Sequence, residues 1–499
     1  MEYVLGIDIG TGSVKAVAVN LSGQSFEVCS RHYGYSAPKA GYYEQDPEQI
    51  WDAFAAAIKT IVDKIGTQPS AISLSSAMHS LITVDENCRP LAPMNTWADS
   101  RSVEIAKRLR ASTEGMAIYT ATGTPLHAMS PLCKITWMKE NDPGLYNKTY
   151  KFIGIKEYIW YRLFDEFAVD HSVASGTGLF NISQLQWHVE SLAYCGITQA
   201  QLSTPVVTNY TRQFDPVKIS ALSFLKTDTS FVVGASDGCL ANLGSMANKP
   251  GIAAMTIGTS GAVRTAGNKP LPNPGAMTFS YILDEDTFIC GGPVNNGGVA
   301  LQWWLKNNFS PDLTEQDYAQ LFDEIAGLSA GSNGLIFLPY LTGERAPIWD
   351  SESCGTFFGV KLQHTRAHFS RAVLEGICYA MKHVLDAVQQ NSEPITQINI
   401  SGGFSKSKVW VQILADITNT NLAILQADDA SAVGAALLAL KSLGMINAYP
   451  EANAADLKII KPDPQNAAVY AKHFGIYKRL YVDLKETMHR LNQMNLKGE

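Results

Sequence analysis

The sequence contains no long apolar run and no segment typical of a secretion signal. Its longest apolar stretch, residues 433–440, is far shorter than the ~18 residues needed to cross a bilayer. The strand-like run at 3–7 is preceded by no basic and apolar leader. We therefore expect a cytoplasmic protein without a membrane partner.

Paired cysteines and basic clusters are also missing. The eight cysteines are scattered and include no C-x-x-C pair, which favours reduced, mostly buried thiols over a disulfide framework or a zinc site. The formal net charge is −7, and no basic patch suited to a nucleic acid occurs. An anionic small molecule remains possible, because backbone N–H groups and local cations can hold phosphate.

No low-complexity linker divides the 499 residues, although a chain of this length needs more than one core. A strand, a Gly/Thr turn and a second strand occur at 7–19 and again at 252–265. Two such copies predict a duplicated α/β domain. We expect domains at 1–246 and 247–445, joined by a short hinge near 247–251, and a helical tail at 446–499.

For one helix, the sequence predicts both the apolar face that is buried and the residue at which the helix starts. Apolar residues recur with a helical period through 47–64, and Asp46 precedes Pro47 as a plausible N-cap. The region from about 99 to 164 is also mainly helical in pattern.

The first candidate for chemistry is the turn after Asp8. Its residues Thr11, Gly12 and Ser13 offer backbone N–H groups and hydroxyls to a phosphate, and glycine permits a close approach. Asp8 is placed to hold Mg²⁺, which favours one or two carboxylates plus phosphate oxygens. The plain alternative is a β-hairpin with Asp8 as a turn former.

A second turn of the same kind contains Gly258 and Thr259. Alone it is a weak signal, because this tetrapeptide, Gly-Thr-Ser-Gly, is common in surface turns. One such loop in each half would place the two loops on opposite sides of one triphosphate.

Asp237 follows an apolar strand and is flanked by small residues. Phosphoryl transfer to a hydroxyl needs a group that orients the nucleophile and accepts its proton. Asp237 fits this role, although an Asp-Gly turn explains the same residues. Further along, Gly402 and Gly403 would let a flat base lie against the backbone, while Ser407 is equally well read as a helix cap.

Taken in order, these features make nearly the whole chain resemble the FGGY carbohydrate kinases, a branch of the actin–hexokinase–Hsp70 superfamily. A narrower resemblance, to the gluconokinases of that family, rests on four segments. They are 75–82 (SSAMHSLI), 96–102 (TWADSRS), 153–158 (IGIKEY) and 291–298 (GGPVNNGG). Xylulokinase-like members usually have Gly-Gln-Met-His-Gly at residues 76–80, and glycerol kinases have Arg-Glu at Met78 and His79.

The resemblance implies two ribonuclease-H-like domains with ATP and substrate in the cleft between them. It implies Asp237 as general base, Asp8 near Mg²⁺, and both Gly/Thr loops on the phosphates. Around the adenosine it places Gly298, Gln302, Gly402, Gly403 and Ser407. On the substrate side it places Met78, His79, Asp99 and Asp237, and Lys156 is a candidate cation for a substrate carboxylate.

The predicted activity is transfer of a phosphoryl group from ATP to the 6-hydroxyl of D-gluconate. A xylulokinase-like pentulose kinase is the alternative within the family, and family members are often homodimers. Two alternatives belong to other classes of protein. One is an actin- or Hsp70-like ATPase, which needs no base at Asp237, and the other is a sugar-sensing regulator. Glu344 and Arg345 are predicted to form a structural pair, and Trp303 and Trp304 to pack in the core.

Overall fold

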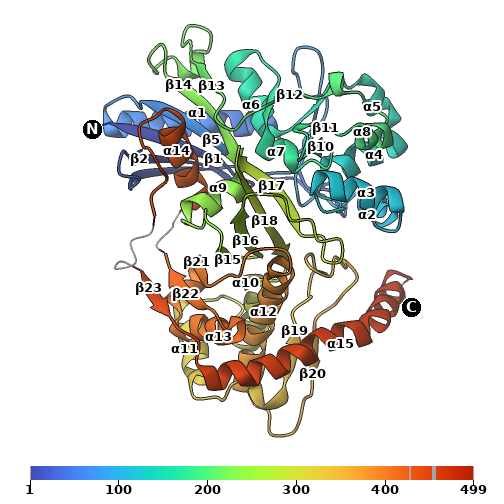
Figure 1. Cartoon of the computed structure of the whole chain (residues 1–499). Coiled ribbons are helices and arrows are strands. Elements are labelled where there is room, and N and C mark those ends of the chain that lie inside the picture. Colours follow the sequence, from blue (N-terminus) through green and yellow to red (C-terminus); the bar gives the residue numbers. More distant parts are fainter. Residues whose placement is uncertain (1, 426–428, 452–456, 498–499) are drawn as a thin grey trace.

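The computed structural model describes residues 2–425, 429–451 and 457–497. Residues 452–456 and 498–499 of the predicted tail lie outside the described residues. The chain forms two lobes, each built on one mixed β-sheet, with the N-terminal lobe at the top of Figure 1.

The first lobe contains a six-stranded sheet in which β1 lies between β5 and β2. β1 pairs parallel with β5 and antiparallel with β2, and β5 pairs parallel with β14. The strands in sheet order are β13 (Thr211–Gln213), β14 (Ser230–Ser236), β5 (Ala71–Ser76), β1 (Tyr3–Ile9), β2 (Ser13–Asn20) and β3 (Ser25–His32).

The second lobe contains a seven-stranded sheet in which β15 lies between β21 and β16. The strands in sheet order are β17 (Phe279–Asp284), β18 (Thr287–Val294), β16 (Gly261–Gly267), β15 (Ile252–Ile257), β21 (Gln397–Ser401), β22 (Asn421–Ile424) and β23 (Lys458–Ile460). In both sheets an antiparallel hairpin is followed by parallel strands on the same side. The predicted duplication of one hairpin is therefore confirmed.

Helix α1 (Pro47–Ile65) shows why the sequence could predict this element. Asp46 accepts a hydrogen bond from the backbone N of Glu48, and Gly66 ends the helix with a positive φ of 74°. The apolar stripe, including Phe54 and Ile58, is fully buried against the first sheet. Burial of this stripe, more than helix propensity, stabilises such an element.

The rest of the first lobe is a helical subdomain beside the sheet (Figure 1). Its helices are α2 (Val103–Arg110), α3 (Thr113–Thr122), α4 (Pro131–Asn141), α5 (Pro143–Lys148), α6 (Ile155–Phe164), α7 (His171–Ser175) and α8 (Val189–Cys195). Four short two-stranded sheets connect parts of this subdomain. They pair β4 (Glu44–Gln45) with β7 (Met94–Asn95), β6 (Ile82–Val84) with β8 (Lys151–Ile153), β9 (Ala168–Asp170) with β12 (Thr204–Val206), and β10 (Phe180–Asn181) with β11 (Gln186–Trp187).

Two helices join the lobes. α9 (Asp237–Gly244) follows β14, and α14 (Ala430–Ser442), although late in the chain, packs on α9 and on β1 and β5 of the first sheet. Glycines make this approach possible: a Cβ on Gly6 would lie 1.8 Å from the carbonyl oxygen of Ala432, and one on Gly434 would lie 2.0 Å from that of Leu240. The starts of both helices consequently face the junction of the lobes.

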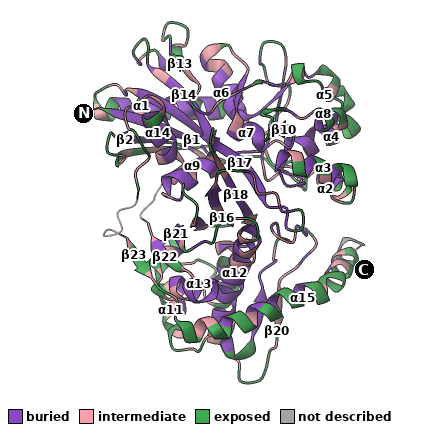
Figure 2. Cartoon of the chain, in the orientation of Figure 1, coloured by how far each residue is buried: buried purple, intermediate pink, exposed green. Residues whose placement is uncertain are grey.

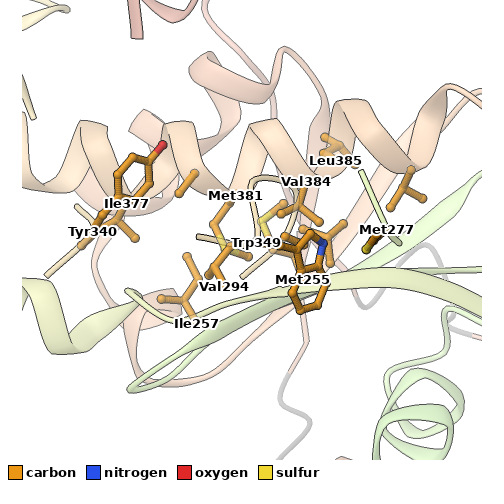
Figure 3. Packing of buried hydrophobic residues seen from close by; sticks show 14 of the residues in the cluster. Met255, Ile257, Met277, Val294, Tyr340, Trp349, Ile377, Met381, Val384 and Leu385 are labelled. Carbon is orange, nitrogen blue, oxygen red and sulfur yellow. The ribbon is translucent and has the colours of Figure 1, made fainter. Parts of the chain in front are cut away.

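The core of the second lobe lies between its sheet and α12 (Arg366–Gln389), which Figure 2 shows as a mostly buried helix. Figure 3 shows Ile377, Met381 and Val384 of α12 above Met255 and Ile257 of β15. The other elements here are α10 (Gly298–Asn308), α11 (Glu315–Ala326), β19 (Ile336–Leu338), β20 (Thr356–Phe358) and α13 (Lys408–Thr418).

The C-terminal helix α15 (Pro464–Lys497) runs along the base of the second lobe (Figure 1). Two tyrosines of this helix hydrogen-bond to the rest of the lobe. Tyr470 donates to Glu375 at 2.8 Å, and the hydroxyl of Tyr477 accepts from that of Tyr340 at 2.9 Å. In the described ranges, none of the helices has the length and apolar character needed to cross a membrane. All eight cysteines are free and six are buried, as predicted.

Candidate active site

A cavity of about 810 Å³ opens where the two lobes meet. Residues from both lobes line it, including Met78, Asp237 and Asp429 on one side and Thr259 and Gly402 on the other. Of the sequence-predicted residues, it brings together Met78, His79, Asp237, Gly258, Thr259 and Gly402.

Asp237 is the first residue of α9 and lines this cavity. Ser236 caps the helix by accepting a hydrogen bond from the backbone N of Cys239, and this cap fixes where the carboxylate emerges. Burial and the nearby charge of Asp8 together raise the pKa of Asp237 to about 6, although Arg264 acts to lower it. An acid with a pKa near 6 is well suited to act as a general base near neutral pH.

Asp8 lies at the end of β1 and accepts a hydrogen bond from the Ser75 hydroxyl at 2.7 Å. Burial raises its pKa, and the charge of Asp429 raises it too, whereas Lys15 lowers it. A buried carboxylate of this kind gains from a nearby cation. No group of three or more His, Cys, Asp or Glu side chains in the described part of the chain could hold a metal ion by itself, so Mg²⁺ here would need phosphate oxygens as further ligands.

The first Gly/Thr turn is closed by a hydrogen bond from the backbone N of Gly10 to the carbonyl of Ser13, at 3.0 Å. The hydroxyl of Thr11 accepts from the indole of Trp97, which lines the cavity. A Cβ on Gly12 would meet nothing within 4 Å, so this turn presents open backbone. Thr11, Gly12 and Ser13 therefore do not line the cavity themselves. They lie next to two residues that do, Trp97 and Lys15.

The second turn forms the cavity wall directly and is held from behind by the start of α10. The backbone N of Gly298 donates to the carbonyl of Gly258 at 2.6 Å, and that of Val299 donates to Thr259 at 3.1 Å. A Cβ on Gly298 would lie 2.8 Å from the Gly258 carbonyl oxygen. Gly298 therefore supports the turn.

The predicted adenosine residues lie on exposed backbone and on two helices. Gly402 has a φ of 110°, and a Cβ there would come 2.9 Å from the carbonyl oxygen of Ile257. Gly403 and Gln302 are exposed. The hydroxyl of Ser407 accepts from the backbone N of Trp410 as the N-cap of α13, which is the structural role that its sequence context also allowed.

His79 lines the cavity with a strained backbone φ of 66°. Its Nδ1 lies 2.8 Å from the carbonyl oxygen of Gly176. Burial lowers the pKa of His79 to about 3, and the charge of Lys134 lowers it further. The ring is therefore neutral, Nδ1 carries the proton, and Nε2 is free to accept from a hydroxyl.

Lys134 is a buried neighbour of His79 that sequence reasoning missed. Its Nζ is buried and donates to the backbone carbonyls of His79 and Thr96, both at 2.6 Å. Burial lowers its pKa to about 7. A lysine in this helix gives no sequence signal of this contact, because the contact depends on how α4 packs.

The prediction that Asp99 binds substrate is not supported by its contacts. Its carboxylate is fully buried, pairs with Arg101 at 2.7 Å and accepts from the backbone N of Tyr43 at 2.9 Å. Arg101 also pairs with Glu44 and lies over the ring of Tyr42, 3.6 Å from its centroid. Asp99 therefore organises this loop and does not face the cavity.

The prediction that Lys156 meets a substrate carboxylate is likewise not supported by its contacts. Its Nζ is buried, forms an ion pair with Asp170 at 2.7 Å and donates to the carbonyl of Ala235 at 2.8 Å. It is near Asp237, and its charge helps to lower the pKa of that carboxylate. Lys156 supports the end of β14 instead of lining the cavity.

Glu344 and Arg345 are neighbours that interact through a hydrogen bond and their charges, as predicted, whereas the expectation for Trp303 is corrected by the structure. Glu344 accepts hydrogen bonds from the backbone of Asn295 and Arg345, while the Arg345 guanidinium faces the cavity and donates to the carbonyl of Val294. Trp304 is buried as predicted, but Trp303 is 38% exposed. The remaining wall residues that sequence reasoning missed are Trp97, Met129, Arg264, Phe279, Tyr281, Pro293 and Asp429.

Comparisons with known proteins identify the same two domains that form the lobes. The N-terminal domain of the FGGY family of carbohydrate kinases matches residues 3–244, and the C-terminal domain of that family matches residues 253–443. A gluconokinase of Bacillus licheniformis is 40% identical over 457 residues, covering 90% of this chain and 89% of the relative. A xylulose kinase of Bacillus subtilis is 29% identical over 494 residues, covering 97% and 98%.

Among solved structures, a gluconate kinase from Lactobacillus acidophilus superposes with a TM-score of 0.93 at 33% identity, covering 98% of this chain and 99% of its own. These matches extend over both lobes and the cavity between them. The chain therefore has the two-domain fold of the actin and hexokinase type and belongs to the FGGY family of carbohydrate kinases, phosphotransferases with an alcohol group as acceptor.

Proposed function

We propose that this chain transfers the terminal phosphoryl group of ATP to the 6-hydroxyl of D-gluconate. The observation that carries the proposal is the position of Asp237, which lines the same cavity as the Gly258–Thr259 turn and the Met78–His79 pair. The gluconokinase relatives at 40% identity support gluconate as the acceptor.

Asp237 would act as the base. Its carboxylate would orient the acceptor hydroxyl and take its proton as the new P–O bond forms. Because the transition state of phosphoryl transfer is loose, positioning and charge neutralisation supply most of the rate. A base at the start of α9 also has its position fixed by the helix cap at Ser236.

The two turns and Asp8 would hold the nucleotide phosphates. The open backbone at Gly12 and the exposed Thr259 suit phosphate oxygens, and Mg²⁺ near Asp8 would neutralise part of the phosphate charge. The opposing loops come from different lobes, so a movement of the lobes would close them on the triphosphate and exclude water.

Met78 and His79 would contact the acceptor chain. The unprotonated Nε2 of His79 can accept from a substrate hydroxyl, and its neutral state leaves the proton transfer to Asp237. Family membership sets aside an actin- or Hsp70-like ATPase without a sugar substrate. A xylulokinase remains the second candidate, because a xylulose kinase from Lactobacillus acidophilus superposes with a TM-score of 0.92 at 33% identity.

The test is a panel assay of ATP-dependent phosphorylation with gluconate, xylulose, ribulose and glycerol as acceptors. Gluconate is expected to give the highest kcat/KM, with the product phosphorylated on the terminal hydroxyl. Robust turnover of xylulose with none of gluconate would overturn the proposal and favour the second candidate.

A further inference from the structure

Three polar groups on the wall of the cavity have a buried atom without a hydrogen-bond partner in the described part of the chain. They are Nε of Arg264, Nε of Arg345 and the hydroxyl of Tyr281. Arg345 is 8% exposed and Tyr281 is 4% exposed. Buried polar groups in proteins are nearly always satisfied, so three unpaired groups on one wall indicate a missing ligand.

The three side chains come from separate segments that hold them in place. Arg264 projects from β16 and Tyr281 from β17, while the Arg345 guanidinium donates to the carbonyl of Val294 at 3.1 Å. Arg345 also lies over the ring of Trp97, 5.4 Å from its centroid. The ring of Tyr281 stacks on Phe279 with centroids 4.5 Å apart.

The two arginines bring positive charge to this wall, with Asp237 near Arg264 and Glu344 near Arg345. Burial lowers the pKa of Arg345 to about 10, although the nearby charge of Glu344 raises it. Burial also lowers the pKa of Arg264. The nearby carboxylate of Glu344 accepts from three neighbouring donors, including the backbone N of Arg345. Each guanidinium still has a buried Nε without a hydrogen-bond partner, which favours binding of an anion that accepts from both.

Gly238 provides the space that this arrangement needs. A Cβ at this position would lie 3.3 Å from Nε of Arg264, tighter than most contacts of a real side chain. The residue after the proposed base therefore leaves the guanidinium open to the cavity. His79 and Trp97 complete the same side of the cavity with one neutral acceptor and one aromatic face.

We infer that Arg264, Tyr281 and Arg345 form a carboxylate subsite that selects sugar acids over neutral sugars. Guanidinium groups match the two oxygens of a carboxylate, and a tyrosine hydroxyl adds a third donor. This inference rests on the proposed function, because it assigns the anionic end of the acceptor. It also replaces Lys156, whose Nζ is already paired with Asp170.

The test compares gluconate with D-glucitol, its neutral counterpart in which a CH₂OH group replaces the carboxylate. The variants are Arg264→Gln, Arg345→Gln and Tyr281→Phe, and Arg212→Gln is the control, an arginine paired with Glu166 outside this cavity. Each arginine variant is expected to raise KM for gluconate by about 10- to 100-fold, as loss of a buried charged hydrogen bond predicts. The kcat/KM for glucitol is expected to stay the same or rise, and the control to match the wild type.

Tyr281→Phe removes only a hydroxyl without a protein partner, so it is expected to fold and to raise KM for gluconate by a few fold. Protection of the protein against thermal unfolding by gluconate gives a second readout that needs no turnover. Equal loss of kcat on gluconate and glucitol in Arg264→Gln would overturn the inference, because it would assign this arginine to the phosphoryl group.

The outcomes separate this inference from the proposed function. If the wild type phosphorylates gluconate and both arginine variants keep its KM, the subsite is wrong and the function stands. If the wild type does not phosphorylate gluconate, but sugar acids inhibit it competitively and Arg264→Gln abolishes that inhibition, the function is wrong and the subsite stands.

Discussion

Asp8 and Asp237 lie at the ends of two strands, β1 and β14, that flank β5, and the charge of Asp8 raises the pKa of Asp237. The proposed metal residue and the proposed base are therefore electrostatically coupled. A cation bound near Asp8 would cancel this repulsion and favour the ionised, active form of Asp237. Binding of Mg²⁺ with ATP would in this way prepare the base.

The coupling predicts the pH dependence of the reaction. Asp237 must be ionised to accept a proton, and its pKa is raised to about 6, so kcat/KM should fall as the pH drops through about 6. Asp8→Asn removes the repulsive charge and should shift this acidic limb to lower pH. A pH profile of kcat/KM for MgATP, which reports on the enzyme before the metal binds, checks this in both proteins, and an unmoved limb in the variant would rule out the coupling. His79 stays neutral over this range and should add no limb.

Asp237→Asn should reduce turnover strongly while ATP binding persists. The amide keeps the shape of the side chain but cannot accept the proton, and loss of a general base costs about 10²–10⁴ in rate. Single-turnover assays and nucleotide titration would measure the two effects separately. Asp228→Asn is a matched control, since this exposed Asp has a φ of 66° that Asn tolerates. Near wild-type turnover in Asp237→Asn would refute the assignment of the base.

The same substitution should stabilise the fold at neutral and alkaline pH. The pKa of Asp237 is higher in the folded protein than the usual value of 3.8, so its ionised form weakens folding above the unfolded pKa. The penalty is absent below pH 4 or so and complete above the folded pKa. Thermal unfolding at about pH 8 should therefore give a higher Tm for Asp237→Asn than for the wild type, with the difference vanishing in acid. A lower Tm at pH 8 would mean that the carboxylate stabilises the fold.

Lys156→Met should act on stability and not on substrate affinity. It leaves Asp170 buried without its partner, which typically costs about 3–5 kcal/mol. Chemical denaturation would measure this loss, and KM for gluconate should change little in protein that remains folded. Lys59→Met breaks the exposed pair with Asp63 and should cost no more than about 1 kcal/mol. A large rise in KM without loss of stability would restore Lys156 to the substrate side.

The sequence predicted features that depend on local pattern. The hairpins at β1–β2 and β15–β16, the cap of α1 and the carboxylate that follows β14 each occupy a short continuous segment. Turn chemistry and hydrophobic period are sufficient for such features, because neighbouring residues determine them. The repeat of one turn in both halves then indicated where the phosphates would lie.

The missed residues depend on contacts between distant segments. Arg264 lies on β16, Tyr281 on β17, and Arg345 between β19 and β20. They meet only because these three segments fold against one another. Conversely, Asp99 and Lys156 occupy motifs that carry the resemblance, but their charges are neutralised by Arg101 and Asp170. No spacing rule distinguishes an arginine that is paired in the fold from one that faces a cavity, so these assignments required the structure.

The contact between α9 and α14 leads to the last prediction. A Cβ on Gly434 would lie 2.0 Å from the carbonyl oxygen of Leu240, so Gly434→Ala must push the two helices apart. Such overpacking typically costs about 1–3 kcal/mol. Because Asp237 begins α9 and Asp429 precedes α14, the displacement should also lower turnover.

Gly475→Ala is the matched control, because this glycine is exposed on α15 and a Cβ there would meet nothing within 4 Å. Alanine favours a helix by up to about 1 kcal/mol over glycine, so this variant should be slightly more stable and fully active. Denaturant unfolding and steady-state kinetics would compare the pair. If Gly434→Ala matched its control in both measurements, close packing of these helices would not be what positions Asp237.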